Sequence, residues 1–293
     1  MSLQYLGLCL LAVAIWSGNT IVSKLAAGSI PPGVIAFERW LIAFLVLTPF
    51  VAKSAWLHRA AIRSHFIKLA ILGLLGMAIC QGLGYYAAGF TSATNMAILL
   101  SLVPLLTLVL SALFLREVPS KLAMLGGVVS LVGIFIVLGK GNPAQLLMQG
   151  VGRGDALMLV VVIALAGYGI LLKGWSGPMP TFTSLYVQMG WALVFLFPGY
   201  ALERSATFTA SNLAMTLYAA LPGSVIAPFV WMKSVSHLGA GRVAVFMNLI
   251  PIATALGAAL FLGEALHSYH FAGGALTIGG IMLSQRNPLK TAQ

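Results

Sequence analysis

The sequence predicts an all-α integral membrane protein, and three observations predict it: composition, the length of the apolar runs and an internal repeat. Of the 293 residues, 60% are hydrophobic and 7% are charged, with a mean hydropathy of +1.01. Soluble domains carry about 25% charged residues. A chain of this composition is expected to bury its surface in lipid.

The apolar runs set the number of predicted membrane spans. Each run has roughly 20 residues, the length at which a helix crosses about 30 Å of hydrocarbon. The runs are too long and too continuously apolar for the alternating strands of a barrel. No Lys or Arg precedes the first run, which predicts a retained span and not a cleaved signal peptide. The ten predicted spans are residues 4–23, 33–52, 67–89, 94–115, 121–139, 154–173, 181–201, 212–234, 241–262 and 269–285.

The distribution of basic residues predicts the orientation, because Lys and Arg favour cytoplasmic loops. One side of the ten-span arrangement collects 11 of the 16 basic residues and the other side collects 5. Both termini are therefore expected in the cytoplasm, with the protein in the inner (plasma) membrane of a bacterium. Lys24 alone, directly after the first span, favours the opposite orientation.

The two halves of the chain repeat one another. At an offset of 147 residues, Pro104 aligns with Pro251 and Glu117 with Glu264. The glycines that align at the same offset are Gly126 with Gly273, Gly127 with Gly274 and Gly133 with Gly280. Each half contains five predicted spans, an odd number, so the second half enters the membrane from the opposite side. Such inverted repeats place a substrate site near the midplane between the halves. The predicted halves are residues 1–140 and 154–293, with a linker at 141–153.

The same segments carry a resemblance to a known family. Trp16, Asn19, Lys24, Pro31-Pro32 and the run from Phe37 to Trp40 resemble the opening of the ten-helix EamA type of the drug/metabolite transporter superfamily. The runs 113–117 and 260–264 are similar to the glutamate motif that ends a helix in each repeat of that family. The resemblance covers nearly the whole chain. It implies ten helices in an inverted arrangement of five and five, and transport, commonly efflux, of small metabolites such as amino acids.

Polar and aromatic residues inside the spans are the candidates for a substrate site. Pro104 and Pro251 lie in the middle of their spans, where proline removes a backbone hydrogen bond, and both are expected to kink the helix during gating. Ser101 and Asn248 precede them by three residues. Helix packing is the alternative role for such polar groups, and an interfacial position is the alternative for Trp231. The predicted substrate-binding residues are Trp16, Asn19, Arg39, Gln81, Tyr85, Ser101, Tyr168, Gln188, Trp231 and Asn248.

Charged residues within spans are costly and are functional candidates by default. Arg39 is predicted either to bind a carboxylate of the substrate or to satisfy carbonyl groups at the ends of neighbouring helices, and its repeat partner at an offset of 149 is Gln188. Glu38 is the only carboxylate at a depth suited to proton coupling. Glu117 and Glu264 end their helices and are expected to be structural, each capping a helix N-terminus.

Several function classes are excluded or disfavoured. The basic residues are scattered and form no nucleic-acid-binding face. The cysteines Cys9 and Cys80 lie in apolar runs without the spacing of a metal site, so no metal or cofactor is expected. No ATPase motif is present, so no ATPase subunit is implied. Gly174–Gly177 matches the GxSG pattern of an intramembrane serine protease, but it lies at a span end and no histidine lies in the middle of a span to serve as its base.

The sequence therefore predicts a secondary transporter that moves a small organic solute by alternating access. An amino acid or a related amphipathic, ammonium-bearing metabolite is the expected substrate, because aromatic faces attract cations. Membrane lipid is the other expected partner. An intramembrane enzyme and a passive uniporter or channel are the alternatives.

Overall fold

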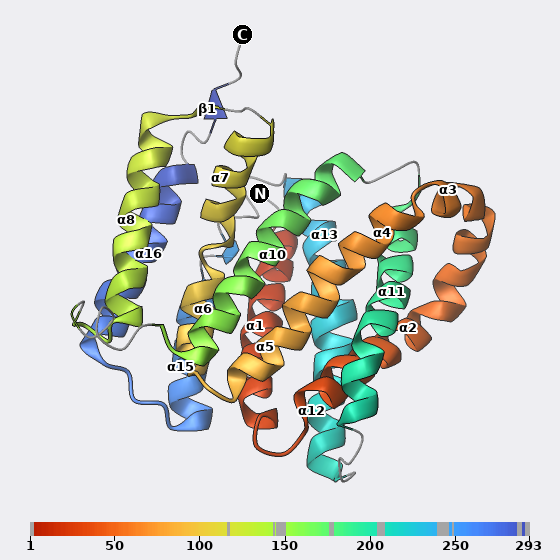
Figure 1. The fold of residues 1–293 in the computed structure, drawn as a ribbon, viewed down its shortest axis with the longest axis horizontal. Helices are drawn as coiled ribbons and strands as arrows, with labels where there is room; N and C mark the ends of the chain where they lie inside the picture. Colours follow the sequence, from red (N-terminus) through yellow and green to blue (C-terminus); the bar gives the residue numbers. More distant parts are fainter. Residues whose placement is uncertain are drawn as a thin grey trace.

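The computed structural model is helical apart from one pair of two-residue strands (Figure 1). It describes residues 3–115, 118–142, 144, 151–175, 179–203, 209–238, 246–247, 249–285 and 289–290. The first part contains α1 (Leu3–Ala26), α2 (Pro32–Leu57), α3 (Arg59–Ser64), α4 (Phe66–Gly73), η1 (Leu74–Ile79), α5 (Cys80–Ala88), α6 (Ala93–Leu100), α7 (Val103–Leu115) and α8 (Lys121–Leu138). The second contains α10 (Arg153–Trp175), α11 (Thr181–Leu202), α12 (Ala210–Leu221), η2 (Pro222–Ile226), α13 (Ala227–Leu238), α15 (Ile250–Leu262) and α16 (Ser268–Gln285). The strands β1 (Val118–Pro119) and β2 (Leu289–Lys290) pair antiparallel.

Seven helical segments of the described chain are long and apolar enough to cross a membrane. They are Gln4–Ala26, Pro32–Leu57, Phe66–Ala88, Lys121–Leu138, Arg153–Leu172, Thr181–Leu202 and Ala210–Trp231. Large apolar side chains also cover the outside, including Phe50 (79% exposed), Leu260 (79%) and Phe261 (73%). A surface of this kind is compatible with lipid and not with water. The chain is a multi-pass membrane protein.

Each of the two prolines lies at the beginning of a helical segment, and at Pro104 the predicted span is interrupted by a break in place of a kink. The predicted span 94–115 consists of α6 and α7, which are separated by Ser101 and Leu102. Pro104 lies in the first turn of α7, and Pro251 lies in the first turn of α15. Proline is tolerated there because the first turn leaves its N–H groups without intrahelical partners.

The third and eighth predicted spans each contain a π-helical turn, which the sequence analysis did not predict. Each π-helical segment lies between two α-helical segments, η1 between α4 and α5, and η2 between α12 and α13. Such turns leave part of the regular hydrogen-bond ladder displaced and are frequent at functional sites.

Glycines bring α8 and α16 into close contact at one end of the molecule (Figure 1). A Cβ atom on Gly133 would lie 2.5 Å from the carbonyl oxygen of Gly273, and one on Gly280 would lie 2.5 Å from that of Gly126. Only glycine permits this approach, which is the way in which small residues drive helix association in lipid.

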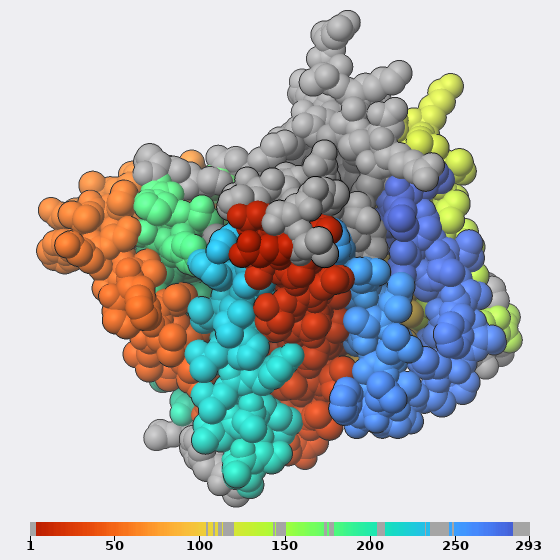
Figure 2. All heavy atoms as spheres, turned by 180° about the vertical axis from the view of Figure 1, so that it is seen from behind, coloured from red at the N-terminus to blue at the C-terminus, as the bar shows by residue number. Residues whose placement is uncertain are grey.

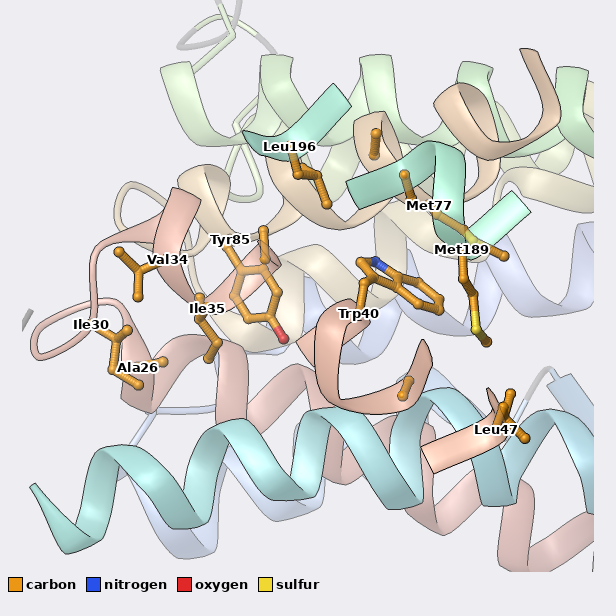
Figure 3. Close-up of a cluster of buried hydrophobic side chains, with 14 of the residues drawn as sticks. Ala26, Ile30, Val34, Ile35, Trp40, Leu47, Met77, Tyr85, Met189 and Leu196 are labelled. Atoms are coloured by element: carbon orange, nitrogen blue, oxygen red, sulfur yellow. The ribbon is translucent and has the colours of Figure 1, made fainter. Parts of the chain in front are cut away.

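The remaining helices pack around α1 and α2. Helix α1 lies between α12–α13 and α15–α16 on the face seen in Figure 2, and it contacts α13 and α15 most extensively. Helix α2 packs along α11. The largest buried apolar cluster lies between α2, η1, α5 and α11, and includes Trp40, Met77, Tyr85, Met189 and Leu196 (Figure 3).

Candidate functional site

A central cavity of about 430 Å³ lies between helices that are far apart in sequence. Its wall is formed by α1, η1, α5, α6, α7, α10 and α15. The predicted site residues that line it are Trp16, Asn19, Gln81, Tyr85, Ser101, Tyr168 and Pro251. Much of the remaining wall is apolar and includes Met96, Ala97, Leu100, Met158, Val161 and Leu165. An apolar cavity of this size with a few polar groups is typical of a small-molecule site.

Arg39 lies directly behind the cavity wall and is 2% exposed. Its Nη1 donates to Gln81 Oε1 at 2.6 Å and to Tyr85 Oη at 3.0 Å. Its Nε and Nη2 donate to Ser224 Oγ at 3.1 and 2.7 Å. The guanidinium also lies 5.3 Å from the centroid of the Trp40 ring. The hydrogen bonds of Arg39 to described residues therefore all go to neutral side chains, from α5 on one side and η2 on the other.

The side chains of Asn19 and Arg39 both lie next to Gly223 of η2. A Cβ atom on Gly223 would lie 3.0 Å from Asn19 Oδ1 and 3.3 Å from Arg39 Nη2. Asn19 Oδ1 is buried and has no hydrogen-bond partner among the described residues. A buried acceptor without a partner is costly, so this atom is a candidate contact for a bound solute.

Tyr168, which lines the cavity, forms a second polar pair with Gln188. Tyr168 Oη donates to Gln188 Oε1 at 3.2 Å, and Gln188 Nε2 donates to Ser184 Oγ at 3.0 Å. Gln188 is 1% exposed and does not line the cavity. The structure thus places Gln188 behind Tyr168, as it places Arg39 behind Gln81 and Tyr85.

Comparison with known proteins identifies the family of this chain. Two stretches of the chain, residues 3–139 and 152–285, match the EamA-like transporter family. The chain belongs to the EamA-like transporter family. The resemblance seen in the sequence is confirmed, and the protein is a membrane transporter and not an enzyme, so the GxSG match carries no catalytic function.

Individual relatives agree with this membership over almost the full length. An uncharacterized transporter of Archaeoglobus fulgidus is 28% identical over 284 residues, which cover 94% of each chain. A probable amino-acid metabolite efflux pump of Salmonella typhimurium is 24% identical over 94% of this chain and 93% of the relative. A solved crystal structure, 16% identical in sequence, aligns over 97% of both chains with a TM-score of 0.62, which shows that the two share a fold.

Other predicted site residues of this EamA-like transporter lie outside the cavity wall. Trp231 packs against Trp16, with ring centroids 5.3 Å apart and planes inclined by 58°. Glu38 is half-buried on α2 and does not line the cavity. Asn248 and Glu117 fall outside the described residues.

Ser101 lines the cavity at the break between α6 and α7, where its hydroxyl donates to the carbonyl oxygen of Ile98 at 2.5 Å. Its hydrogen is therefore used within its own helix, and the side chain offers the cavity only acceptor capacity.

Glu264 caps the N-terminus of α6. Its carboxylate accepts hydrogen bonds from the backbone N–H groups of Ala93 (2.7 Å) and Thr94 (3.2 Å) and from Thr94 Oγ1 (2.8 Å). Because the N-terminal end of a helix favours negative charge, this contact anchors the half-helix α6. Lys24 Nζ similarly donates to the carbonyl oxygens of Ala88 (2.8 Å) and Thr91 (2.7 Å), at the end of α5.

A second, polar cavity of about 650 Å³ lies at this end of the transporter, and we call it the vestibule. Its wall includes Lys24, Asn95, Asp155, Glu264 and His267. Residues that are adjacent in sequence line the two cavities. Ser23 and Met96 line the central cavity, and Lys24 and Asn95 line the vestibule. The sequence analysis did not predict it, although the charged residues that follow several spans were a usable signal.

Two further polar residues of the transporter were missed by the sequence analysis. Ser224 holds Arg39 from η2, and its position after Pro222 and Gly223, in the middle of an apolar run, was the available signal. Glu203 accepts hydrogen bonds from the hydroxyl of Tyr86 and from the backbone N–H of Gly33 at 2.7 Å. It thereby joins the C-terminal end of α11 to the N-terminal end of α2.

Proposed function

We propose that the protein is a secondary exporter of amino acids or related amphipathic metabolites, which works by alternating access between two inverted five-helix halves. The observation that carries the proposal is the central cavity, whose wall combines helices from both halves of the chain. In transporters built from inverted repeats, the substrate site lies at the repeat interface near the midplane.

The packing supports the inverted repeat. Helix α1 contacts α13 in the way that α10 contacts α5, and α12 packs on α2 as α4 packs on α11. The π-helical turns begin at Leu74 and Pro222, an offset of 148 residues. The family match falls into two stretches of nearly equal length. These relations favour halves at residues 1–140 and 154–293, joined through 141–153, with ten spans in all.

The chemistry of the cavity supports a solute with both polar and apolar parts. Asn19, Gln81 and Tyr168 provide hydrogen-bonding groups, and the apolar wall accepts a hydrocarbon or aromatic portion. The name of the Salmonella typhimurium relative, a probable amino-acid metabolite efflux pump, agrees with a solute of this type.

Orientation and coupling belong to the same proposal. With both termini in the cytoplasm of a bacterium, the vestibule opens to the outside, because Lys24 and Asp155 follow and precede spans at that side. Proton coupling is assigned to Glu38, the carboxylate within α2, since no carboxylate lines the described wall of the cavity. Glu38→Gln should then abolish the response of transport to a pH gradient while solute exchange continues.

The test is a transport screen in proteoliposomes loaded with a mixed metabolite pool and analysed by mass spectrometry. A secondary exporter depletes particular amino acids from the lumen, and an imposed pH gradient drives that depletion beyond equilibrium. A passive uniporter only equilibrates them, whatever the gradient. If no amino acid leaves the liposomes faster than from protein-free controls, the proposed substrate class is wrong.

A further inference from the structure

The hydrogen bonds of Arg39 fix the polarity of one end of the central cavity. A guanidinium donates hydrogen bonds and accepts none. Gln81 must therefore use its carbonyl oxygen toward Arg39, and Tyr85 must use a lone pair of its hydroxyl oxygen. Gln81 Nε2 also donates to Cys80 Sγ at 3.7 Å, so what remains for the cavity is the other N–H of Gln81 and the hydroxyl hydrogen of Tyr85. This part of the wall thus presents hydrogen-bond donors.

Among the residues that the structure describes, no carboxylate forms a hydrogen bond or an ion pair with Arg39. Ser224, its third hydrogen-bonding partner, is also neutral, and its hydroxyl donates to the carbonyl oxygen of Ala219 at 2.9 Å. The guanidinium is buried in the membrane-embedded part of the protein, where an isolated charge is costly. A positive charge behind a wall of donors is complementary to an anion.

We propose that Arg39, Gln81 and Tyr85 form a carboxylate-recognition end of the cavity, so that the exported solute is a small carboxylic acid. Gln81 and Tyr85 donate hydrogen bonds to the carboxylate, and Arg39 orients both side chains and supplies the charge. The inference rests on the proposed transport function and deepens it by naming the group that the site selects.

The Tyr168 part of the cavity wall has the reverse polarity. Tyr168 uses its hydroxyl hydrogen toward Gln188, which leaves oxygen lone pairs and the ring face for the cavity. Tyr168 follows Asn19 by 149 residues, and Gln188 follows Arg39 by the same interval. The two ends are thus equivalent in position but only one is cationic. A solute binds with its carboxylate toward Gln81 and Tyr85 and with a neutral or cationic portion toward Tyr168.

The effect of removing the charge can be estimated. A carboxylate that accepts from Gln81 and Tyr85 would lie roughly 6 Å from the guanidinium, and at an effective dielectric constant of about 20 the attraction corresponds to roughly a hundredfold in affinity. Partial screening by water in the cavity reduces this, so a change of about 10- to 100-fold is expected.

The first measurement needs no knowledge of the solute. Cys80 lines the cavity and keeps 7% of its surface exposed, whereas Cys9 is 0% exposed and does not line it, so a Cys9→Ser background leaves one reporter thiol. The rates of its reaction with an anionic (sulfonate) and a cationic (trimethylammonium) methanethiosulfonate are compared as a ratio, which cancels changes in thiol reactivity. Ser101→Cys, also in the cavity wall, gives the same ratio at a second position.

Arg39→Gln should shift this ratio at least tenfold toward the cationic reagent. Arg39→Lys, which keeps the charge, should shift it much less. Arg59→Gln, at an exposed position on α3, is the matched control and should leave it unchanged. An equal ratio in wild type and Arg39→Gln would overturn the proposal, because the guanidinium would then set no potential in the cavity.

The second measurement separates this inference from the transport function on which it rests. Proteoliposomes are assayed for efflux of phenylalanine, leucine and methionine and of their carboxyl amides. The wild type should prefer the acids, and Arg39→Gln should lose that preference. If Arg39→Gln lowers transport of acids and amides equally, Arg39 is a structural residue and the inference fails while the function stands. If neither acids nor amides move but the reagent ratio shifts, the anion site stands and the amino-acid function fails.

Discussion

The contact between α8 and α16 gives a sharp test of the fold, through the substitution Gly280→Ala. A Cβ atom at position 280 would lie 2.5 Å from the carbonyl oxygen of Gly126 and equally close to the backbone nitrogen of Ser130. Both neighbours are backbone atoms of α8, so no side chain can rotate away. The whole helix must move for the methyl group to fit.

The size of the effect follows from this distance. Ordinary Cβ contacts begin at 3.4 Å, so α8 and α16 would have to separate by about 0.9 Å at this point. Overpacking of this kind costs about 1–3 kcal/mol. Alanine recovers up to about 1 kcal/mol through its higher helix propensity. Subtracting about 1 kcal/mol from the overpacking cost leaves a net loss of up to about 2 kcal/mol, which corresponds to a fall in Tm of up to roughly 8 °C on the scale of domains of 150–250 residues.

Thermal denaturation of the purified protein in detergent measures the change. Gly279→Ala is the matched control, because position 279 lies on the same helix and a Cβ atom there meets nothing within 4 Å. It should leave Tm unchanged or raise it by a few degrees. If Gly280→Ala and Gly279→Ala have the same Tm, the close approach of the two helices is wrong.

Three further outcomes are expected. Gly84→Phe should abolish transport without lowering Tm, because Gly84 lines the cavity and a Cβ atom there meets nothing within 4 Å. Gly169→Phe is the control and should transport normally, because position 169 is equally uncrowded but does not line the cavity. Glu264→Ala should lower stability by about 1 kcal/mol through loss of the α6 cap, and Glu264→Gln by less, as read from Tm. Reporter fusions after residue 293 and within 141–153 should report the cytoplasm and the outside respectively, and finding both on one side would contradict five spans per half.

Much of the fold was predictable because lipid leaves few solutions for an apolar chain. Run length alone located most of the helices, since every backbone group in a span must be satisfied within the protein. The glycines that align between the two halves lie where α8 and α16 approach each other, but the sequence did not state that these two helices are partners. The break at Ser101 and Leu102 and the two π-helical turns were not predictable in form. A proline or glycine inside an apolar run indicates an irregularity, but the neighbouring helices decide whether it becomes a kink, a break or a π turn.

The sequence predicted several of the residues that line the cavity, but it did not predict the hydrogen bonds between them. Trp16, Asn19, Gln81, Tyr85 and Tyr168 stand out because polar and aromatic groups are scarce in these runs, and all of them line the cavity. The hydrogen-bond partner of each side chain depends on the rotation of its helix about the helix axis. The sequence does not state that rotation.

Arg39 illustrates the limit most clearly. The sequence offered it two partners, a carboxylate of the substrate or carbonyl groups at helix ends. In the structure its described hydrogen bonds go to three neutral side chains and not to carbonyl groups at helix ends, and one of these partners, Ser224, was not among the predicted site residues.

The difference between Arg39 and Gln188 matters because the two occupy equivalent positions in a duplicated chain. A duplicated site with identical ends would accept an asymmetric solute in either of two orientations. A cation at one end makes those orientations unequal in free energy, by an amount that grows as the cavity excludes water. With the proposed carboxylate site, one substitution between the halves would therefore be enough to give the solute a single preferred orientation, without a change in the packing that the repeat proposal assigns to both halves.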